Sequence, residues 1–349
     1  MRAKISSLVV RPLRATVAVL ALVGAAHCGT GNAFVNGVSQ GSQTATPRGS
    51  TAAATAASSA SGATAGGAAA APSTGSQGQK AATAGVEIDT QGGAVDLGFW
   101  SGAVTAVGTL ASSPAPAARI VVGSYSTSTG VNLAYGDNGQ SALPAGRKGA
   151  TFTGDRGTEA LLTALDALNA SVVLEVQPGL APLPTLAAEV LQHYQGHKSV
   201  AGIGINLLYY GTNNNDLGSV ALSDADAQAI VQAVRGTGSS ATVYLRHYSS
   251  DFMPPSARSG LGFVLDAAGF ADVADMSSDY SGWASKFAPS PVQFVIGAQK
   301  DQGWACALAG GAQQLIGAAQ GAGSNVNNVT WSSGTITALY PTNIFSCLN

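Results

Sequence analysis

The sequence predicts an α/β fold of the (β/α)₈ TIM barrel type, preceded by a signal peptide and a disordered linker. Residues 86–349 have the composition of a globular domain, and about 265 residues is the usual size of one such barrel. Eight short apolar, β-rich runs recur along this part, and helical patterns separate most of them. A doubly wound sheet with fewer strands is the alternative that these patterns leave open.

The first 28 residues have the three parts of a secretory signal: a basic start, an apolar run over 15–23, and small residues through Ala26. This predicts export to the cell surface, the periplasm or the extracellular medium. Cys28 stands where a lipoprotein cysteine would stand, and cleavage after Ala25 or Ala26 without lipidation is the alternative. No later run has eighteen consecutive apolar residues, so we expect membrane contact only through such an N-terminal lipid anchor.

Residues 29–85 form the predicted linker. They are mostly Ala, Ser, Thr and Gly with very few aromatic or branched apolar side chains, which cannot offset the entropy lost on ordering. We therefore expect three parts: the signal peptide at 1–28, a flexible tether at 29–85, and a barrel at 86–349.

The barrel strands are predicted from runs of branched and apolar residues. The eight candidates are 95–100, 119–124, 171–176, 200–207, 241–247, 261–265, 292–297 and 328–332. Helical patterns between them cover 158–168, 183–194, 224–234, 271–287 and 307–320. Ser223 precedes two acidic residues, which is typical of a helix start. Residues 101–118 and 125–156 are loop-like, so the first two units of the barrel are the least regular.

The charge balance argues against one class of partner, nucleic acid. The first 85 residues carry six basic and no acidic residues, which leaves ten basic against eighteen acidic residues in the predicted barrel. Such a domain lacks the basic footprint that neutralises phosphates. We therefore expect no nucleic-acid partner.

Two of the three cysteines lie close together near the end of the chain. Cys306 and Cys347 both fall in the last forty-four residues, and thiols in an oxidising compartment tend to pair. This predicts a disulfide that ties the C-terminal tail to the barrel. Metal or redox chemistry is the alternative, but no CxxC or His-Cys spacing favours it, and we expect neither a metal nor a cofactor.

Polar residues at the ends of the predicted strands mark the candidate site, because barrel chemistry collects there. Glu175 and Asp266 are the candidate catalytic carboxylates. The candidate ligand-binding residues are Asn206, Tyr209, Tyr210, His247, Gln299, Asp301, Trp304 and Trp331. Each has a plain structural alternative. Glu175 would then be a buried partner of Arg246, His247 a core histidine, and Trp331 a packing residue.

The run at 200–210, VAGIGINLLYY, resembles strand four of the chitinase-type glycoside hydrolases, whose pattern there is D-G-x-D-x-D-x-E. It is more similar to an uncharacterised group of bacterial and archaeal barrel proteins that have G-F-G-V-D-V-E-W-Y. Segments at 174–179, 245–248 and 263–266 continue this resemblance in order, and the match spans about 157–335. The resemblance implies a glycoside-hydrolase-like barrel with a carbohydrate ligand.

The sequence departs from both patterns at two positions. Asn206 replaces the Asp and Leu208 replaces the Glu. In the chitinase type, that Glu protonates the leaving oxygen while the substrate's acetamido group attacks, assisted by the Asp. Leucine cannot transfer a proton, and an amide has no useful pKa for it. Since residues two apart on a strand face the same side, positions 204, 206 and 208 are predicted to point inward together.

Three functions remain open at this stage. The first is a carbohydrate-binding barrel without catalysis, in which tyrosine and tryptophan rings face sugar rings. The second is an active glycosidase that uses Glu175 or Asp266 with a raised pKa. The third is a structural cell-surface protein whose barrel makes protein contacts.

Overall fold

The computed structural model describes residues 82–339 apart from 112, 114 and 213–216. The predicted signal peptide, Cys28 and nearly all of the predicted linker lie outside the described residues, as does Cys347. In the part of the chain that is described, no helix has the length and apolar character needed to cross a membrane.

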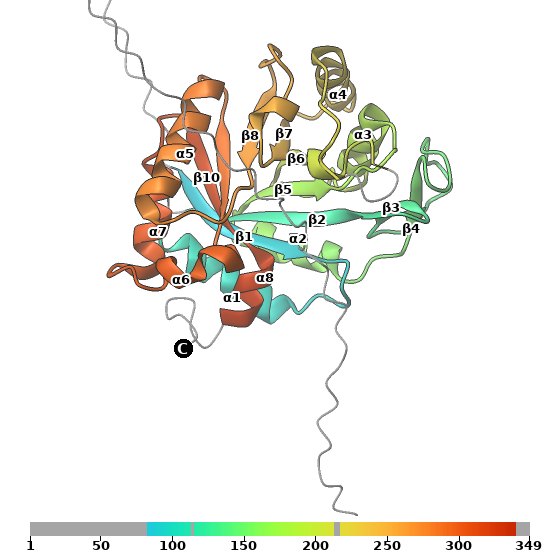
Figure 1. The fold of residues 1–349 in the computed structure, drawn as a ribbon. Coiled ribbons are helices and arrows are strands. Elements are labelled where there is room, and N and C mark those ends of the chain that lie inside the picture. Colours follow the sequence, from blue (N-terminus) through green and yellow to red (C-terminus); the bar gives the residue numbers. More distant parts are fainter. Residues whose placement is uncertain (1–81, 112, 114, 213–216, 340–349) are drawn as a thin grey trace, which may run out of the picture. The chain divides into compact units, whose positions relative to one another are not determined.

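Eight parallel strands form a closed barrel (Figure 1). They are β1 (Thr83–Asp89), β2 (Ala117–Ser126), β5 (Ser171–Val176), β6 (Val200–Asn206), β7 (Thr242–His247), β8 (Leu261–Leu265), β9 (Val292–Ile296) and β10 (Val326–Trp331). Each pairs with its neighbours in chain order, and β1 pairs with both β10 and β2, which closes the sheet. This confirms the predicted (β/α)₈ barrel.

Strand β2 continues beyond the barrel into a small extension. It pairs antiparallel with β3 (Gly130–Leu133), which pairs parallel with β4 (Ala150–Phe152). Gly130 has φ +78° and packs against backbone: an added Cβ would lie 2.5 Å from the carbonyl oxygen of Gly149. Only glycine meets both requirements, so the sequence fixes the turn that returns the chain towards the barrel.

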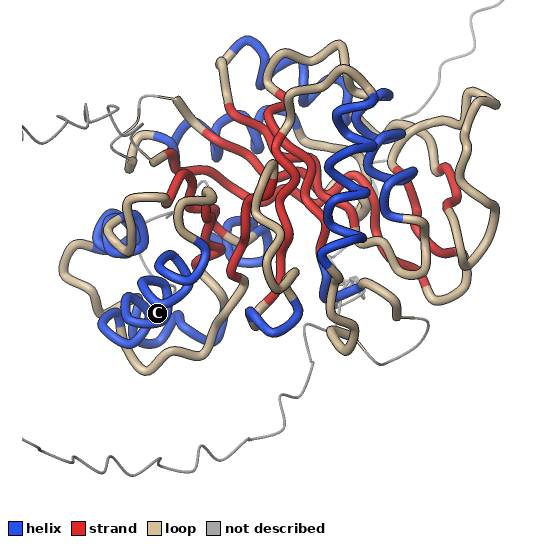
Figure 2. The backbone as a smooth tube through the Cα atoms, turned by 90° about the horizontal axis from the view of Figure 1, so that it is seen from above, coloured by secondary structure: helices blue, strands red, loops and turns tan. Residues whose placement is uncertain are grey.

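Helices lie outside the strands (Figure 2). They are α1 (Leu97–Gly108), α2 (Thr158–Ala167), α3 (Leu183–His193), α4 (Asp224–Gly236), α5 (Val273–Phe287), α6 (Gln302–Ala305), α7 (Gly311–Gln320) and α8 (Ser333–Leu339), with 3-10 turns η1 (Leu207–Tyr209), η2 (Ser250–Phe252) and η3 (Gln299–Asp301). Ser223 caps α4 as predicted, because its hydroxyl accepts from the backbone N–H of Asp226. Apolar side chains of these helices and of the outward strand positions make the main core.

The predicted first strand is wrong, and the first three residues of the true first strand, β1, were assigned to the linker. Most of 95–100 begins helix α1, which Asp96 caps through its side chain. Strand β1 starts at Thr83, so the folded part begins before the predicted boundary at 86. The small residues that made this segment look like linker are required there: a Cβ at Gly85 would lie 1.9 Å from the carbonyl oxygen of Ala117 on β2.

Candidate functional site

The inward positions of the strands change from apolar to charged along the barrel axis. Val173, Tyr244 and Val264 form one apolar cluster with Val295. Two residues further along three of these strands come Glu175, Arg246 and Asp266, towards the carboxyl ends. Because side chains two apart point to the same side of a strand, a charged layer lies inside the barrel above an apolar one.

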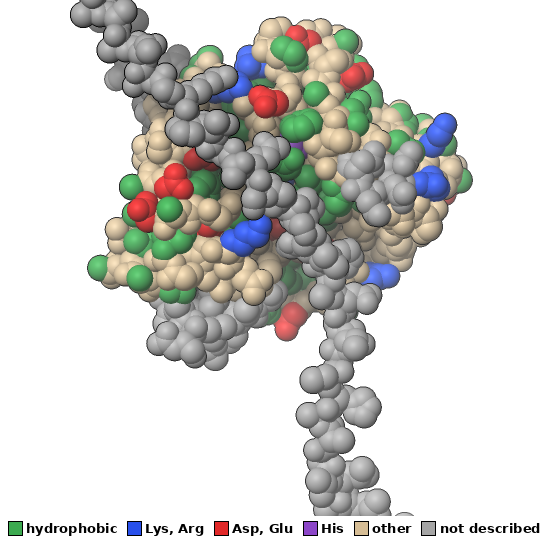
Figure 3. All heavy atoms as spheres, viewed as in Figure 1, with side chains coloured by type: hydrophobic (Ala, Val, Ile, Leu, Met, Phe, Trp, Pro, Cys, Tyr) green, Lys and Arg blue, Asp and Glu red, His purple; other side chains and the backbone are tan. Residues whose placement is uncertain are grey.

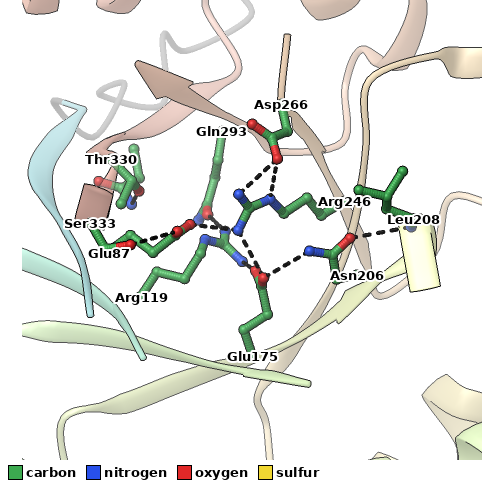
Figure 4. Close-up of polar contacts among 11 residues, drawn as sticks. Glu87, Arg119, Glu175, Asn206, Leu208, Arg246, Asp266, Gln293, Thr330 and Ser333 are labelled. Atoms are coloured by element: carbon green, nitrogen blue, oxygen red, sulfur yellow. Dashed lines mark hydrogen bonds and ion pairs between the residues drawn. The ribbon is translucent and has the colours of Figure 1, made fainter. Parts of the chain in front are cut away.

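Arg246 lies at the centre of the charged layer (Figure 4). Its Nη1 donates to Glu87 Oε2 at 2.5 Å and to Glu175 Oε1 at 2.8 Å. Its Nε and Nη2 both donate to Asp266 Oδ2, at 3.0 and 2.7 Å. One guanidinium therefore joins carboxylates from β1, β5 and the end of β8. Burial alone would lower the pKa of Arg246, but the three carboxylates raise it well above its ordinary value, so the group stays charged.

Glu175 is completely buried, and both of its oxygens are occupied. Oε2 accepts from Arg119 Nη1 at 2.7 Å. Oε1 accepts from Arg246 and from Asn206 Nδ2, the latter at 3.2 Å. Arg119 is equally buried and also donates to Gln293. Glu175 is thus a buried partner of Arg246, which was its structural alternative, and it also neutralises a second arginine.

Asn206 ends strand β6 and turns the chain. Its Oδ1 accepts from the backbone N–H of Leu208 at 3.2 Å, which starts the 3-10 turn η1. The prediction that position 208 continues the inward alternation of the strand is therefore wrong. A Cβ built on Gly218 would meet the Leu208 side chain at 2.9 Å and the His247 ring at 3.1 Å, so Leu208 packs against the loop that contains Gly218.

Two carboxyl groups on β1 belong to this site, and the sequence analysis missed both. Burial raises the pKa of Glu87, the nearby Arg246 lowers it, and the negative charges of Glu175 and Asp266 raise it further, so the net shift is upward. Desolvation also raises the pKa of Asp89, two residues on. The only sequence signal was the alternation of Val86 and Ile88 with these two acids.

Among the predicted aromatic residues, accessibility differs sharply. Tyr209 is half-buried and lies 5.8 Å, ring to ring, from Tyr125. Tyr248, which was not among the predicted binding residues, is 41% exposed and packs against His247. Trp331 is only 7% exposed, and its Nε1 donates to Thr335 Oγ1 at 2.9 Å. Its ring lies against Gly297, where a Cβ would come within 2.5 Å of it.

The remaining predicted binding residues have different surroundings. His247 is buried, which lowers its pKa to about 4, and its Nδ1 accepts from the backbone N–H of Ser249. Asp301 Oδ1 accepts from two backbone N–H groups in the loop after β8, at 2.7 and 2.9 Å. Gln299 is exposed, Trp304 packs partly against the core, and Tyr210 is half-buried. His247 is therefore neutral near pH 7, and Asp301 holds a loop.

Neither a metal nor the disulfide is tested by the described residues. Within them, no group of three or more His, Cys, Asp or Glu side chains is arranged to hold a metal ion. Cys306 follows α6 at the surface, and its predicted partner Cys347 lies outside the described residues. The pairing stays a prediction.

Comparison with known proteins gives little beyond the fold. No protein-family model matches this chain. No curated protein matches it either. It is similar in structure to a GH5-4 broad-specificity endoglucanase from an uncultured bacterium, at 10% identity and a TM-score of 0.38 over 71% of this chain and 86% of that one. It is also similar to a Bacteroidetes-affiliated GH5 cellulase linked with a polysaccharide utilisation locus, at 11% identity and 0.40 over 71% and 82%. The class that the geometry defines is a (β/α)₈ barrel, and likenesses this distant carry no conclusion about activity.

Proposed function

We propose that the mouth of the barrel binds an oligosaccharide or polysaccharide and does not hydrolyse it by the chitinase-type route. One observation carries this proposal. At the carboxyl ends of the strands, tyrosine rings and the carboxylates of Asp89 and Asp266 are open to solvent. The fully buried Glu175 is engaged by Arg119, Arg246 and Asn206. Flat rings with a few fixed polar groups suit a sugar ring and its hydroxyls.

Asp266 supplies the fixed polar edge. Its side chain is 36% exposed, and Oδ2 takes both hydrogen bonds from Arg246. Oδ1 has no hydrogen-bond partner among the described residues and is left for a ligand hydroxyl. Because both donors of Arg246 converge on Oδ2, this oxygen is held in place by the guanidinium and Oδ1 is not.

The same exposure favours one alternative, a glycosidase that uses Asp266. Of the two carboxylates predicted to be catalytic, Asp266 is partly exposed to solvent and Glu175 is fully buried. A structural cell-surface role is the third possibility. We also propose export, a flexible tether and, where Cys28 is lipidated, an N-terminal anchor. Acidic and basic side chains are spread over the face of the described residues drawn in Figure 3, which agrees with a non-nucleic-acid partner.

Binding and turnover on a polysaccharide panel test the proposal. We expect binding without turnover in the wild type, and weaker binding after Tyr248→Ala. Tyr248→Phe keeps the ring and serves as the matched control for stacking. Asp266→Asn is paired with Asp279→Asn, a change at an exposed position on α5. If the wild type hydrolyses a sugar, and Asp266→Asn abolishes this turnover while Asp279→Asn does not, the protein is a glycosidase that uses Asp266 and the binding proposal is wrong. Neither binding nor turnover on any sugar would favour the structural role.

A further inference from the structure

The charged layer contains more carboxylates than guanidiniums. Glu87, Glu175 and Asp266 stand against Arg119 and Arg246, and all five meet in one hydrogen-bonded network (Figure 4). An unbalanced charge in a desolvated interior is costly, and a buried group more often changes its protonation than keeps such a charge. One proton among three carboxyl groups would balance the layer.

The three carboxyl groups are not equivalent as proton sites. Glu175 accepts three hydrogen bonds, two of them from guanidiniums, so both of its oxygens are occupied. Asp266 accepts two from Arg246 and is partly solvated. Glu87 accepts one bond from a guanidinium, and its side chain is 12% exposed. Of the three carboxyl groups, Glu87 therefore has the fewest hydrogen bonds that would stabilise a negative charge.

We propose that Glu87 holds the proton that balances this network, and that it presents a neutral carboxylic acid to a carbohydrate oxygen at the floor of the barrel mouth. The proton resides on Oε1, because Oε2 already accepts from Arg246. The neighbour of Oε1 is Ser333 Oγ at 3.4 Å, which is long for a hydrogen bond between two oxygens. A ligand oxygen acting as acceptor gives Oε1–H a better partner.

The upward shift in the pKa of Glu87 agrees with this assignment. The charged groups that face it are Arg246 on β7, Glu175 on β5, Asp266 after β8 and Arg119 on β2. Since the folded pKa of Glu87 lies above the unfolded value, the contribution of Glu87 to stability is fully present below the unfolded pKa of about 4.3 and is lost as pH rises through the folded pKa. A glutamine at this position would have nearly the same shape as a protonated glutamate, but it would not titrate.

Infrared spectroscopy tests the proton directly, because the carbonyl stretch of a protonated carboxyl group is separate from carboxylate bands. At pH 7 we expect such a band in the wild type, its loss in Glu87→Gln, and its retention in Glu189→Gln, which alters a carboxylate on α3 that accepts from Ser141. We also expect Glu87→Gln to fold with an undiminished thermal midpoint at pH 7. A wild type without the band, or a band that survives Glu87→Gln, overturns the proposal.

The ligand part rests on the proposed carbohydrate function and has its own readout. Binding of the best sugar from the panel is expected to weaken about tenfold in the wild type once Glu87 ionises at high pH, and to stay constant over the same range in Glu87→Gln, whose amide still donates. If binding depends on pH in the same way in the wild type and in Glu87→Gln, Glu87 does not contact the ligand. If no sugar binds, the proposed function fails while the infrared result still decides where the proton lies.

Discussion

Introducing an aspartate at position 206 is expected to destabilise the protein in a pH-dependent way. Asn206 Nδ2 lies 3.2 Å from Glu175 Oε1, so Asn206→Asp replaces a donor with a second carboxylate at that distance. At an effective dielectric constant near 20, two unit charges so placed repel by about 5 kcal/mol. The new carboxyl group can escape this repulsion by taking up a proton.

The cost of that proton limits the loss. At pH 7, keeping an aspartate with an unfolded pKa of about 3.9 protonated costs about 4 kcal/mol, which is less than the repulsion. The folded pKa of the new group is raised, so the penalty is absent below pH 4 and grows as pH rises towards that folded pKa. For a domain of this size, about 4 kcal/mol lowers the melting temperature by about 10 °C at pH 7.

Thermal unfolding at pH 4, 5.5 and 7 measures the effect. Asn138→Asp is the matched control, since Asn138 is exposed and uses only its Oδ1, as acceptor for the N–H of Gln140, which aspartate retains. We expect no comparable pH-dependent loss there. A loss at position 206 that is the same at all three pH values, or no loss at pH 7, would refute the view that the amide donor of Asn206 is matched to the acceptor oxygen of Glu175.

Other perturbations follow from the same contacts. Glu175→Gln weakens the pairing of two buried guanidiniums and should cost about 3–5 kcal/mol in chemical denaturation. His247 has a folded pKa of about 4, so stability on the order of 3 kcal/mol, present above pH 6.5, should disappear as pH falls to 4, and His247→Gln should flatten that part of the profile. Burial lowers the pKa of His197, but the hydrogen bonds of Glu159 and Asp166 outweigh burial and raise it. His197→Ala should therefore cost more at pH 6 than at pH 9. Non-reducing mass mapping should find Cys306 linked to Cys347, a bridge worth about 4 kcal/mol for a loop of forty residues.

Seven of the eight barrel strands could be predicted because each is buried on both faces and reads as an apolar run. The segment Ser171–Val176 is an example, and its predicted bounds are those of the structure. Strand β1 gives no such run. It needs glycine at position 85 to approach β2 and carries the acids Glu87 and Asp89, so its composition resembles a linker with two charges. Close backbone approach is a tertiary requirement that a local pattern does not reveal.

The position of the site could be predicted from the sequence, but the pairing of its acidic and basic side chains could not. Topology placed Glu175, Asn206 and Asp266 at one end of the barrel, and all three lie there. Which arginine neutralises which acid depends on contacts across the barrel, such as Arg246 with Glu87, 159 residues apart in the sequence. Strand alternation gave the wrong direction for Leu208, because the Asn206 side chain ends the strand and starts a 3-10 turn.

Asn206 and Leu208 are explained by the charged layer and by the turn that ends strand β6. A barrel interior is normally filled by branched apolar side chains, and replacing a buried ion network by such residues is often neutral or stabilising, so stability does not account for this one. The network instead sets the charge state of its members. Because Glu175 accepts hydrogen bonds from two arginines and from position 206, that position requires a donor, which asparagine supplies and aspartate does not. With the chain turning at Asn206, position 208 faces a loop, where leucine packs beside Gly218. Asn206 and Leu208 thus suit the charges and the turn around them, and what is open to a ligand is the exposed edge of Asp266 and the carboxyl group of Glu87.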